Sequence, residues 1–319
     1  MATFTLTARQ PFIFHSVVNS HGWRQLAPFG FDESTFTLSY ILRASNGRVM
    51  DLKIRAAEIG VSVETKGRLS RLEANEVKEA VSWMFALDAD YSSFYKAARK
   101  EPNLRKAIKL AHGRVLRSPT LFEDVVKTIL TTNTLWGATK SMTQKLIASF
   151  GDPISSLSGG SRQPRPNLAK SKSESRPEVE GPIKKAFPTP DRIAASSPEV
   201  LKEAVRVGYR APALHQLALR VTSGELDLES LKTSTLPSLE LRKELMKING
   251  VGPYAAANLL LILGRPDFIP IDSWALKLVS HEWHKGKPVT AREVEKAFEK
   301  WGEYKGFAFW FWDWKYTGG

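Results

Sequence analysis

The sequence predicts an α+β protein, mostly α-helical, in which an antiparallel sheet precedes a helical core. Two observations support this fold class. Apolar residues alternate with polar ones before residue 66, as in strands with one buried face, and from Glu73 onward they recur at helical spacing. With 319 residues and roughly 150 residues per domain, the chain is long enough for about two domains.

The expected strands lie between residues 1 and 66, and their apolar residues share one parity within each strand. A Ser-Asn-Gly turn at 45–47 separates the first two runs and predicts a hairpin. The runs are Phe36, Leu38, Tyr40 and Leu42, then Met50, Leu52 and Ile54, then Ile59, Val61 and Val63.

The helical region begins with a stripe that includes Val77, Val81 and Met84. Ser118-Pro119 fits a helix start, with a capping residue followed by proline at the first helical position. This helix is expected to carry Phe122, Val125, Val126 and Ile129 on its apolar face. Helices are expected to resume at Pro198 and to continue to the end of the chain.

Residues 158–190 hold six prolines, five serines and a basic excess without apolar periodicity. This composition predicts a disordered or loosely held insertion, either a solvated linker or a source of extra DNA contacts. The expected domains are therefore a β-rich unit with helices at 1–112 and a helical core at 113–157 and 191–319.

The composition of the chain limits the classes of function that it can have. The 46 basic and 33 acidic residues give a net charge of +13, which favours a polyanionic partner. The absence of cysteine excludes disulfides, cysteine-ligated metals and thiol nucleophiles. His281 and His284 are interpreted as helix-surface residues rather than metal ligands. No apolar run is long enough to span a membrane, and the N-terminus lacks a signal peptide.

The most informative segment is the glycine hairpin Gly250-Val251-Gly252, between a helix expected at 239–246 and a second helix beginning at Pro253. Two glycines around one apolar residue allow a tight turn whose N–H groups, with the next helix N-terminus, can bind a phosphate. A plain helix-turn-helix corner would show the same glycines.

Asp272 follows the apolar, proline-containing approach Phe268-Ile-Pro-Ile and precedes another helix. It can serve as an N-cap, a structural role, or as a functional carboxylate. At this distance after the hairpin, the segment resembles the helix-hairpin-helix (HhH-GPD) DNA glycosylase superfamily. In that family the hairpin grips a DNA phosphate and the Asp is catalytic.

Other segments resemble the same family. They imply an N-terminal TBP-like antiparallel sheet domain followed by an all-helical HhH-GPD core, over nearly the whole chain except 158–190. Ser118 through Asn133 is similar to the family's helix and gap-filling loop. Val207-Gly-Tyr-Arg-Ala211 and Trp301 through Ala308 resemble the 8-oxoguanine glycosylase branch.

Two departures separate the chain from that branch. Tyr254 stands where bifunctional enzymes carry a lysine nucleophile, and Phe309 stands where they carry a base-reading glutamine. The resemblance therefore implies a monofunctional enzyme, closest to DNA-3-methyladenine glycosylase II, with a stacking pocket for cationic alkylated purines. Tyr254, Phe309, Trp136 and Trp310 are the expected pocket residues, although an aromatic segment such as the C-terminal Phe307 to Trp314 more often belongs to a core.

The resemblance also implies the DNA contacts. These are Lys247 and the hairpin residues, Asn133 as a wedge or alternatively a helix C-cap, and Tyr209 with Arg210. The partner is damaged double-stranded DNA and no cofactor is needed. The carbonyls of Met246, Ile248 and Val251 are candidate ligands of a monovalent cation. A monomer without membrane association is expected, in the nucleoid or the nucleus.

Two alternatives remain. One is an 8-oxoguanine glycosylase that works without the usual lysine. The other is a non-catalytic DNA-binding protein that uses the hairpin only to hold phosphate. Such a binder has no need of a carboxylate beside DNA, so Asp272 favours an enzyme.

Overall fold

The computed structural model describes residues 1–154 and 184–314. Its N-terminal part is a five-stranded antiparallel sheet in the order β1-β5-β4-β3-β2, which confirms the predicted sheet. The strands are β1 (Ala2–Thr7), β2 (Phe29–Asp32), β3 (Thr37–Arg43), β4 (Val49–Ala57) and β5 (Gly60–Thr65).

The register of β3 and β4 places the predicted apolar residues opposite one another on the buried face. Leu38 pairs with Ile54, and Tyr40 pairs with Leu52. Gly47, with φ +85°, forms the turn between the strands, as the Ser-Asn-Gly signal predicts. Phe36 is an exception, because it precedes β3 with a left-handed backbone and a side chain that is 55% exposed.

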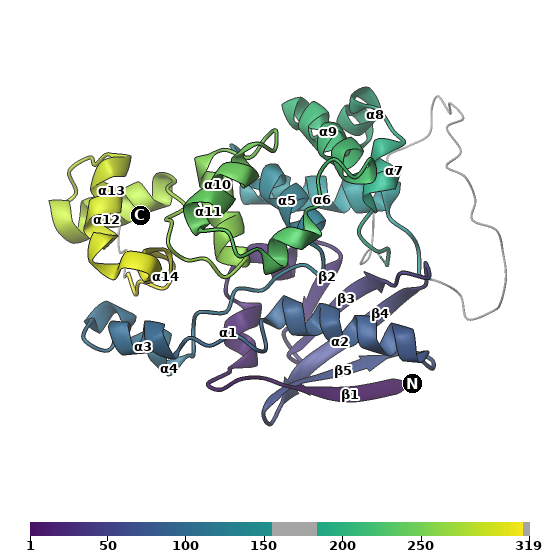
Figure 1. The fold of residues 1–319 in the computed structure, drawn as a ribbon, viewed down its shortest axis with the longest axis horizontal. Helices are drawn as coiled ribbons and strands as arrows, with labels where there is room; N and C mark the ends of the chain where they lie inside the picture. The colour runs from purple at the N-terminus through teal and green to yellow at the C-terminus, as the bar shows by residue number, and fades with distance from the viewer. Residues whose placement is uncertain (155–183, 315–319) are drawn as a thin grey trace.

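Helix α2 (Arg71–Phe85) lies against the sheet together with the short α1 (Phe14–Val18) (Figure 1). Ser70 and Glu73 form a capping box at the start of α2. The predicted stripe, including Val77 and Val81, is buried. Local capping and apolar periodicity thus agree in this helix.

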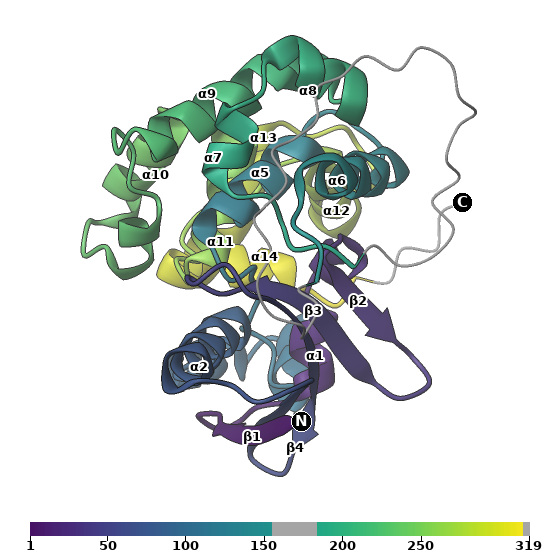
Figure 2. The same cartoon turned by 90° about the vertical axis from the view of Figure 1, so that its right-hand side faces the viewer.

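The rest of the described chain is helical, as predicted (Figures 1 and 2). The helices are α3 (Ser92–Ala98), α4 (Arg105–Lys109), α5 (Leu121–Thr131), α6 (Trp136–Phe150), α7 (Pro190–Ala194), α8 (Pro198–Val205), α9 (Ala211–Thr222), α10 (Ser238–Met246), α11 (Pro253–Ile262), α12 (Ser273–His284), α13 (Ala291–Phe298) and α14 (Lys305–Trp310). Short 3-10 turns lie at Gly22–Gln25, Gly208–Arg210 and Glu299–Tyr304.

The start of α5 differs from the prediction. Thr120, not Ser118, is the N-cap, and its hydroxyl accepts a hydrogen bond from the N–H of Glu123. Ser118 instead donates its backbone N–H to the carboxylate of Asp124. The first helical residue is therefore Leu121, two positions beyond the predicted proline.

Two large hydrophobic cores and a small cluster of Ile41, Val49 and Ala186 organise the described part of the chain. The first joins the sheet to the central helices α5 to α11, and the second joins α3 and α4 to α12, α13 and α14. Helix α11 contributes to both, with Leu260 in the first and Leu261 in the second. The helices at 92–109 thus share a core with the C-terminus, although the predicted boundary at residue 112 assigns them to the N-terminal unit.

Most of the predicted insertion at 158–190 lies outside the described residues. Its C-terminal end, from Lys184, packs onto the protein, which corrects the predicted boundary at 190. Ala186 donates its N–H to the carbonyl of Asp152 at 2.8 Å, and Phe187 is buried in the first core. Helix α7 begins at Pro190, eight residues before the predicted resumption of helices.

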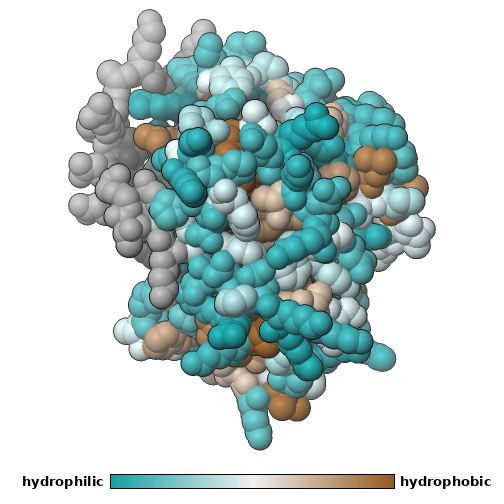
Figure 3. All heavy atoms as spheres, turned by 90° about the vertical axis from the view of Figure 1, so that its left-hand side faces the viewer, coloured by the Kyte–Doolittle hydropathy of each residue, from teal (hydrophilic) through white to brown (hydrophobic). Residues whose placement is uncertain are grey.

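One face of the molecule shows how its surface hydrophobic residues are distributed. The face at the left of Figure 1 is mainly hydrophilic, with scattered hydrophobic patches (Figure 3). None of the described helices is both long enough and apolar enough to cross a membrane. Within residues 1–154 and 184–314 no group of three or more His, Asp and Glu side chains could hold a metal ion.

Candidate active site

The glycine hairpin connects α10 to α11 as the sequence predicts. A hydrogen bond of 3.0 Å from the N–H of Val251 to the carbonyl of Ile248 closes the turn. Gly250 has φ +86°, and a Cβ placed there would lie 3.3 Å from Ala213 and from Ile129. The fold therefore requires glycine at this position.

Gly252 has no comparable structural requirement. Its φ is −88°, and a Cβ placed there would meet no atom within 4 Å. The N–H groups of Gly250 and Gly252 donate to no described residue and lie at the positive end of α11. A glycine that the fold does not need, beside free N–H groups, is suited to close approach of an anion such as phosphate.

A cavity of about 990 Å³ separates the hairpin from the loop after α5. Most of the residues predicted to contact DNA line it, together with the carbonyl candidates Met246 and Ile248. The lining includes Asn133, Tyr209, Arg210, Gly250, Val251, Gly252, Tyr254 and Asp272. Lys247 does not line it, because its Nζ is paired with Glu244 at 2.7 Å on the surface.

Asp272 is exposed at the edge of this cavity and forms the N-cap of α12. Its Oδ1 accepts a hydrogen bond of 2.9 Å from the N–H of Ala275. No described residue donates to Oδ2. The structural and the chemical interpretation of Asp272 are therefore compatible, because one oxygen fixes the helix start while the other is available to a reacting group.

Asn133 follows α5 with φ +46°, a left-handed conformation typical of a residue just after a helix end. Its side-chain amide contacts the hydroxyl of Tyr209 at 3.4 Å. Both side chains are exposed, and that of Tyr209 is 66% accessible. The pair thus projects from the same rim of the cavity, although it comes from two separate segments.

Arg210 differs from the prediction of direct DNA contact. Its side chain is only 7% exposed, and its guanidinium donates to the carbonyl of Thr132 in the loop after α5. The guanidinium also packs over the Tyr209 ring, 4.5 Å from the centroid. Arg210 therefore braces the loop and the tyrosine from behind, since its donors are directed into the protein.

A second cavity of about 250 Å³ adjoins the first, and Tyr254 lines both. Trp136 and Trp310 line it too, so three of the four predicted pocket aromatics converge. Its volume is below the range of drug-sized pockets, about 300–1,000 Å³. A cavity of this size, walled by aromatic rings, suits one planar base.

The two tryptophans are fixed by the N-terminal unit. Trp310 Nε1 donates to the carbonyl of Ser20, and Trp136 Nε1 donates to Oε1 of Gln25, both at 2.9 Å. Gly22 lies under Trp136, where a Cβ would come within 2.3 Å of the ring. Ser20 and Gln25 thus hold the pocket walls in place, and His21, Gly22 and Trp23 line the pocket, although no local sequence pattern predicts this role.

Phe309 is not a pocket residue. It is 6% exposed and packs edge-on against Phe298 in the second core, with ring centroids 5.8 Å apart. Consecutive residues of a helix point in directions about 100° apart. In α14 the side chain that reaches the pocket is therefore Trp310 and not Phe309.

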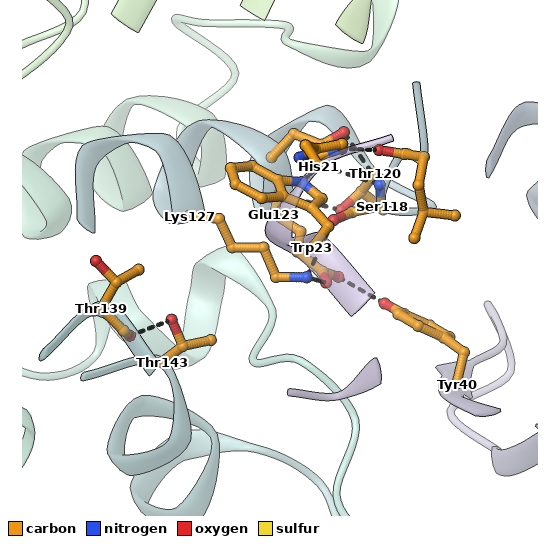
Figure 4. A network of polar contacts seen from close by, with 11 residues as sticks. His21, Trp23, Tyr40, Ser118, Thr120, Glu123, Lys127, Thr139 and Thr143 are labelled. Atoms are coloured by element: carbon orange, nitrogen blue, oxygen red, sulfur yellow. Dashed lines mark hydrogen bonds and ion pairs between the residues drawn. The ribbon is translucent and has the colours of Figure 1, made fainter. Parts of the chain in front are cut away.

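A buried polar network, which the sequence does not predict, connects Trp23, Tyr40, Glu123 and Lys127 beside the pocket (Figure 4). Trp23 donates from Nε1 to Asp124 at 2.7 Å, and burial raises the pKa of Asp124 to about 7. The fully buried Lys127 pairs with Glu123 at 2.5 Å, and Tyr40 donates to the same carboxylate at 2.6 Å. The network ties the sheet and the pocket wall to α5.

Tyr254 is kept as a neutral phenol by its surroundings. Burial raises the pKa of Tyr254 above its ordinary value, and the nearby carboxylate of Asp272 raises it further. The side chain is thus an uncharged aromatic surface at physiological pH, placed between the two cavities. It cannot act as an amine nucleophile.

Comparison with known proteins identifies the family. A model of the "HhH-GPD superfamily base excision DNA repair protein" matches residues 126–303, more than half of the chain. The chain belongs to the HhH-GPD superfamily. The matched range holds α6, the hairpin and Asp272, and this HhH-GPD protein is accordingly a DNA glycosylase of base excision repair whose partner is DNA.

Proteins similar to this HhH-GPD protein include one curated glycosylase and two solved structures. A DNA-3-methyladenine glycosylase of Bacillus subtilis is 26% identical over 241 residues, 74% of this chain and 71% of its own. The structure of MBOgg1 with a low-affinity DNA ligand has a TM-score of 0.69, 25% identity and 98% coverage of both chains. A 3-methyladenine DNA glycosylase of Archaeoglobus fulgidus has a TM-score of 0.69 at 18% identity, covering 98% of this chain and 97% of its own, and shares the fold.

Proposed function

We propose that this HhH-GPD protein is a monofunctional glycosylase that removes alkylated purines of the 3-methyladenine type from damaged double-stranded DNA. The observation that carries the proposal is the aromatic cavity of Tyr254, Trp136 and Trp310 beside the carboxylate of Asp272. No lysine of the described residues lines either cavity. Base release without covalent attachment of the sugar to an amine fits this arrangement.

The reaction begins when the damaged nucleotide rotates out of the duplex into the aromatic cavity. An alkylated purine carries positive charge, and the faces of Tyr254, Trp136 and Trp310 attract a cationic ring. A neutral base has less to gain from these faces. Stacking thus favours the alkylated purine over normal bases.

Bond cleavage depends on Asp272. The C1′–N bond breaks, and its electron pair leaves with the base and neutralises the positive ring. The sugar becomes an oxocarbenium-like cation, which the carboxylate stabilises. Water then forms the C1′–O bond and loses its proton to the carboxylate or to solvent. The product is an intact abasic site.

In this proposal the larger cavity, between the glycine hairpin and the loop after α5, binds the DNA backbone. The free N–H groups of the hairpin bind a backbone phosphate, while Asn133 and Tyr209 enter the space that the base has left. A monovalent cation at the carbonyls of Met246, Ile248 and Val251 would supply further positive charge beside that phosphate. The net charge of +13 adds attraction over a longer range.

The organisation of the protein follows the same proposal. The TBP-like sheet unit supplies one wall of the pocket through His21, Gly22 and Trp23, while the helical core carries the hairpin and Asp272. The scattered hydrophobic patches on the face in Figure 3 fit a monomer. Base excision implies work in the nucleoid of a bacterium or the nucleus of a eukaryote.

A second candidate is 8-oxoguanine release without the usual lysine. The segment Gly208 to Ala211, which resembles the 8-oxoguanine glycosylase branch, favours it. A panel of duplexes, each with one lesion, distinguishes the candidates. We expect release of 3-methyladenine and 7-methylguanine, slower release of deaminated or etheno purines, and almost none of 8-oxoguanine.

The panel also tests the absence of a lysine nucleophile. Alkali should be required for strand cleavage after base release, and borohydride added during turnover should trap no protein–DNA adduct. Substituting Tyr254 by Ala should lower kcat/KM for methylated purines by about 1–3 kcal/mol of stacking. Fastest release of 8-oxoguanine, or a strong borohydride adduct, would overturn the proposal.

A further inference from the structure

The segment from Ser20 to Trp23 is held against the helical core on both sides. Leu116 donates its N–H to Oγ of Ser20 at 2.9 Å, and its carbonyl accepts from Nε2 of His21 at 2.6 Å. Trp23 anchors the other end of the segment through Asp124. His21 also packs against the Trp23 ring, with centroids 4.5 Å apart, so the imidazole has a fixed orientation.

The hydrogen bond to Leu116 fixes the tautomer of His21. A carbonyl can only accept, so Nε2 carries the proton and Nδ1 presents a lone pair. His21 lines the aromatic cavity, and no described residue donates to Nδ1. Nδ1 is not completely enclosed by protein atoms, so it is free to accept a further hydrogen bond.

We propose that His21 Nδ1 is the acceptor for the exocyclic amino group of the flipped purine and makes His21 a specificity-determining residue. The proposal rests on the proposed base pocket. The aromatic rings Tyr254, Trp136 and Trp310 bind any planar cation by its faces. His21 is placed to test the edge of the ring, where adenine and guanine derivatives carry an amino group and hypoxanthine carries none.

The surroundings of His21 suit this role. Burial lowers the pKa of His21 to about 4, and the positive charge of Lys127 contributes to the lowering. The imidazole is therefore neutral at physiological pH. A neutral acceptor attracts the amino group of a cationic base, whereas an imidazolium would repel the same ring.

Two substitutions separate the acceptor from the structural hydrogen bond. His21→Gln places an N–H near the position of Nε2, so it keeps the bond to Leu116 and removes the acceptor at Nδ1. His21→Asn places an oxygen near the position of Nδ1, so it keeps the acceptor and loses the bond to Leu116. A purely structural role predicts that the asparagine variant is the more damaged of the two in every assay.

The readout is the preference for an amino group. Duplexes with 7-methylguanine or 7-methylhypoxanthine differ only in that group at C2, and kcat/KM is measured for both. Free 3-methyladenine and 3-methylpurine, which differ at C6, are compared as inhibitors. We expect the wild type and His21→Asn to prefer the amino form about tenfold in at least one pair, the size of one hydrogen bond to a charged partner. His21→Gln should lose that preference while retaining its thermal stability.

The outcomes separate this inference from the proposed function. If the wild type releases both 7-methylpurines without preference and the two inhibitors bind equally well, the His21 inference is wrong although the alkylpurine assignment stands. The inference is equally overturned if His21→Gln keeps the preference. If the wild type releases neither 7-methylpurine, the proposed function itself fails, and the inference fails with it.

Discussion

Replacing Asp272 by Asn separates its two roles, because only the charge is lost. The asparagine oxygen can still accept from the N–H of Ala275, now at 2.9 Å from Oδ1, and Asn caps helices as well as Asp. Loss of the negative charge at the start of α12 should cost about 0.3–1 kcal/mol of stability. Loss of the charge facing the oxocarbenium ion should cost about 10²-fold or more in rate, about 2.7 kcal/mol.

The assay is base release in a single turnover from a methylated duplex, with urea unfolding measured on the same samples. Binding of the lesion duplex should change little, since the charge acts chiefly in the transition state. Asp272→Ala is the matched control, because it should lose similar activity and about 1 kcal/mol more stability through the missing cap.

Two results would refute this reasoning. If Asp272→Asn keeps more than about a tenth of the wild-type rate, the carboxylate is not a main contributor to catalysis. If its activity falls only in proportion to the folded fraction in urea, Asp272 is a helix cap and nothing more. In both cases the catalytic assignment would have to move to another group in the cavity.

Three further predictions follow from backbone, packing and charge. Gly252→Ala should weaken binding of undamaged duplex without changing thermal stability. Gly250→Ala should instead lower the melting temperature, because residue 250 has a φ of +86°. Equal binding by the wild type and Gly252→Ala would exclude the hairpin from phosphate contact. Gly22→Ala should displace the Trp136 ring, cost about 1–3 kcal/mol of stability and slow base release, as checked by unfolding and single-turnover assays; full activity would show that the ring position is unimportant. Burial raises the pKa of Asp124 to about 7, so the native state retains a proton that the unfolded state loses, and the free energy of unfolding should fall as the pH rises from about 4 to about 7. Asp124→Asn should lack this component when urea titrations at pH 4.5 and pH 8 are compared, and an identical pH dependence in both proteins would contradict the shift.

The parts of the protein that the sequence predicted correctly depend on neighbours along the chain. The hairpin at 45–47 and the capping box of α2 are specified within a few residues, so their patterns are sufficient. The glycine hairpin before α11 is local in the same way. The start of α5 was misplaced by two residues because Ser118 and Thr120 are both capping residues, and only the tertiary partner Asp124 decides between them.

The pocket could be predicted only in part, because its walls come from distant segments. Trp136 and Trp310 were candidates as aromatic residues, but nothing local to His21 indicates that it meets Tyr254 more than 200 positions later. Phe309 and Trp310 are adjacent and similar in character, so only the rotation of α14 separates the core residue from the pocket residue. The resemblance to the 8-oxoguanine glycosylase branch places Arg210 at the DNA, although its guanidinium donates to loop carbonyls.

Helix α11 connects the phosphate-binding and base-binding parts of the site. Most of its residues are buried, and it is held between two cores, with Leu260 on one side and Leu261 on the other. The hairpin amides and Tyr254 sit at the same end of this one stiff rod. A distant cavity-forming substitution such as Leu260→Ala would shift the whole helix. The hairpin amides and the Tyr254 ring would then move together, so phosphate binding and base stacking would be impaired together rather than one at a time.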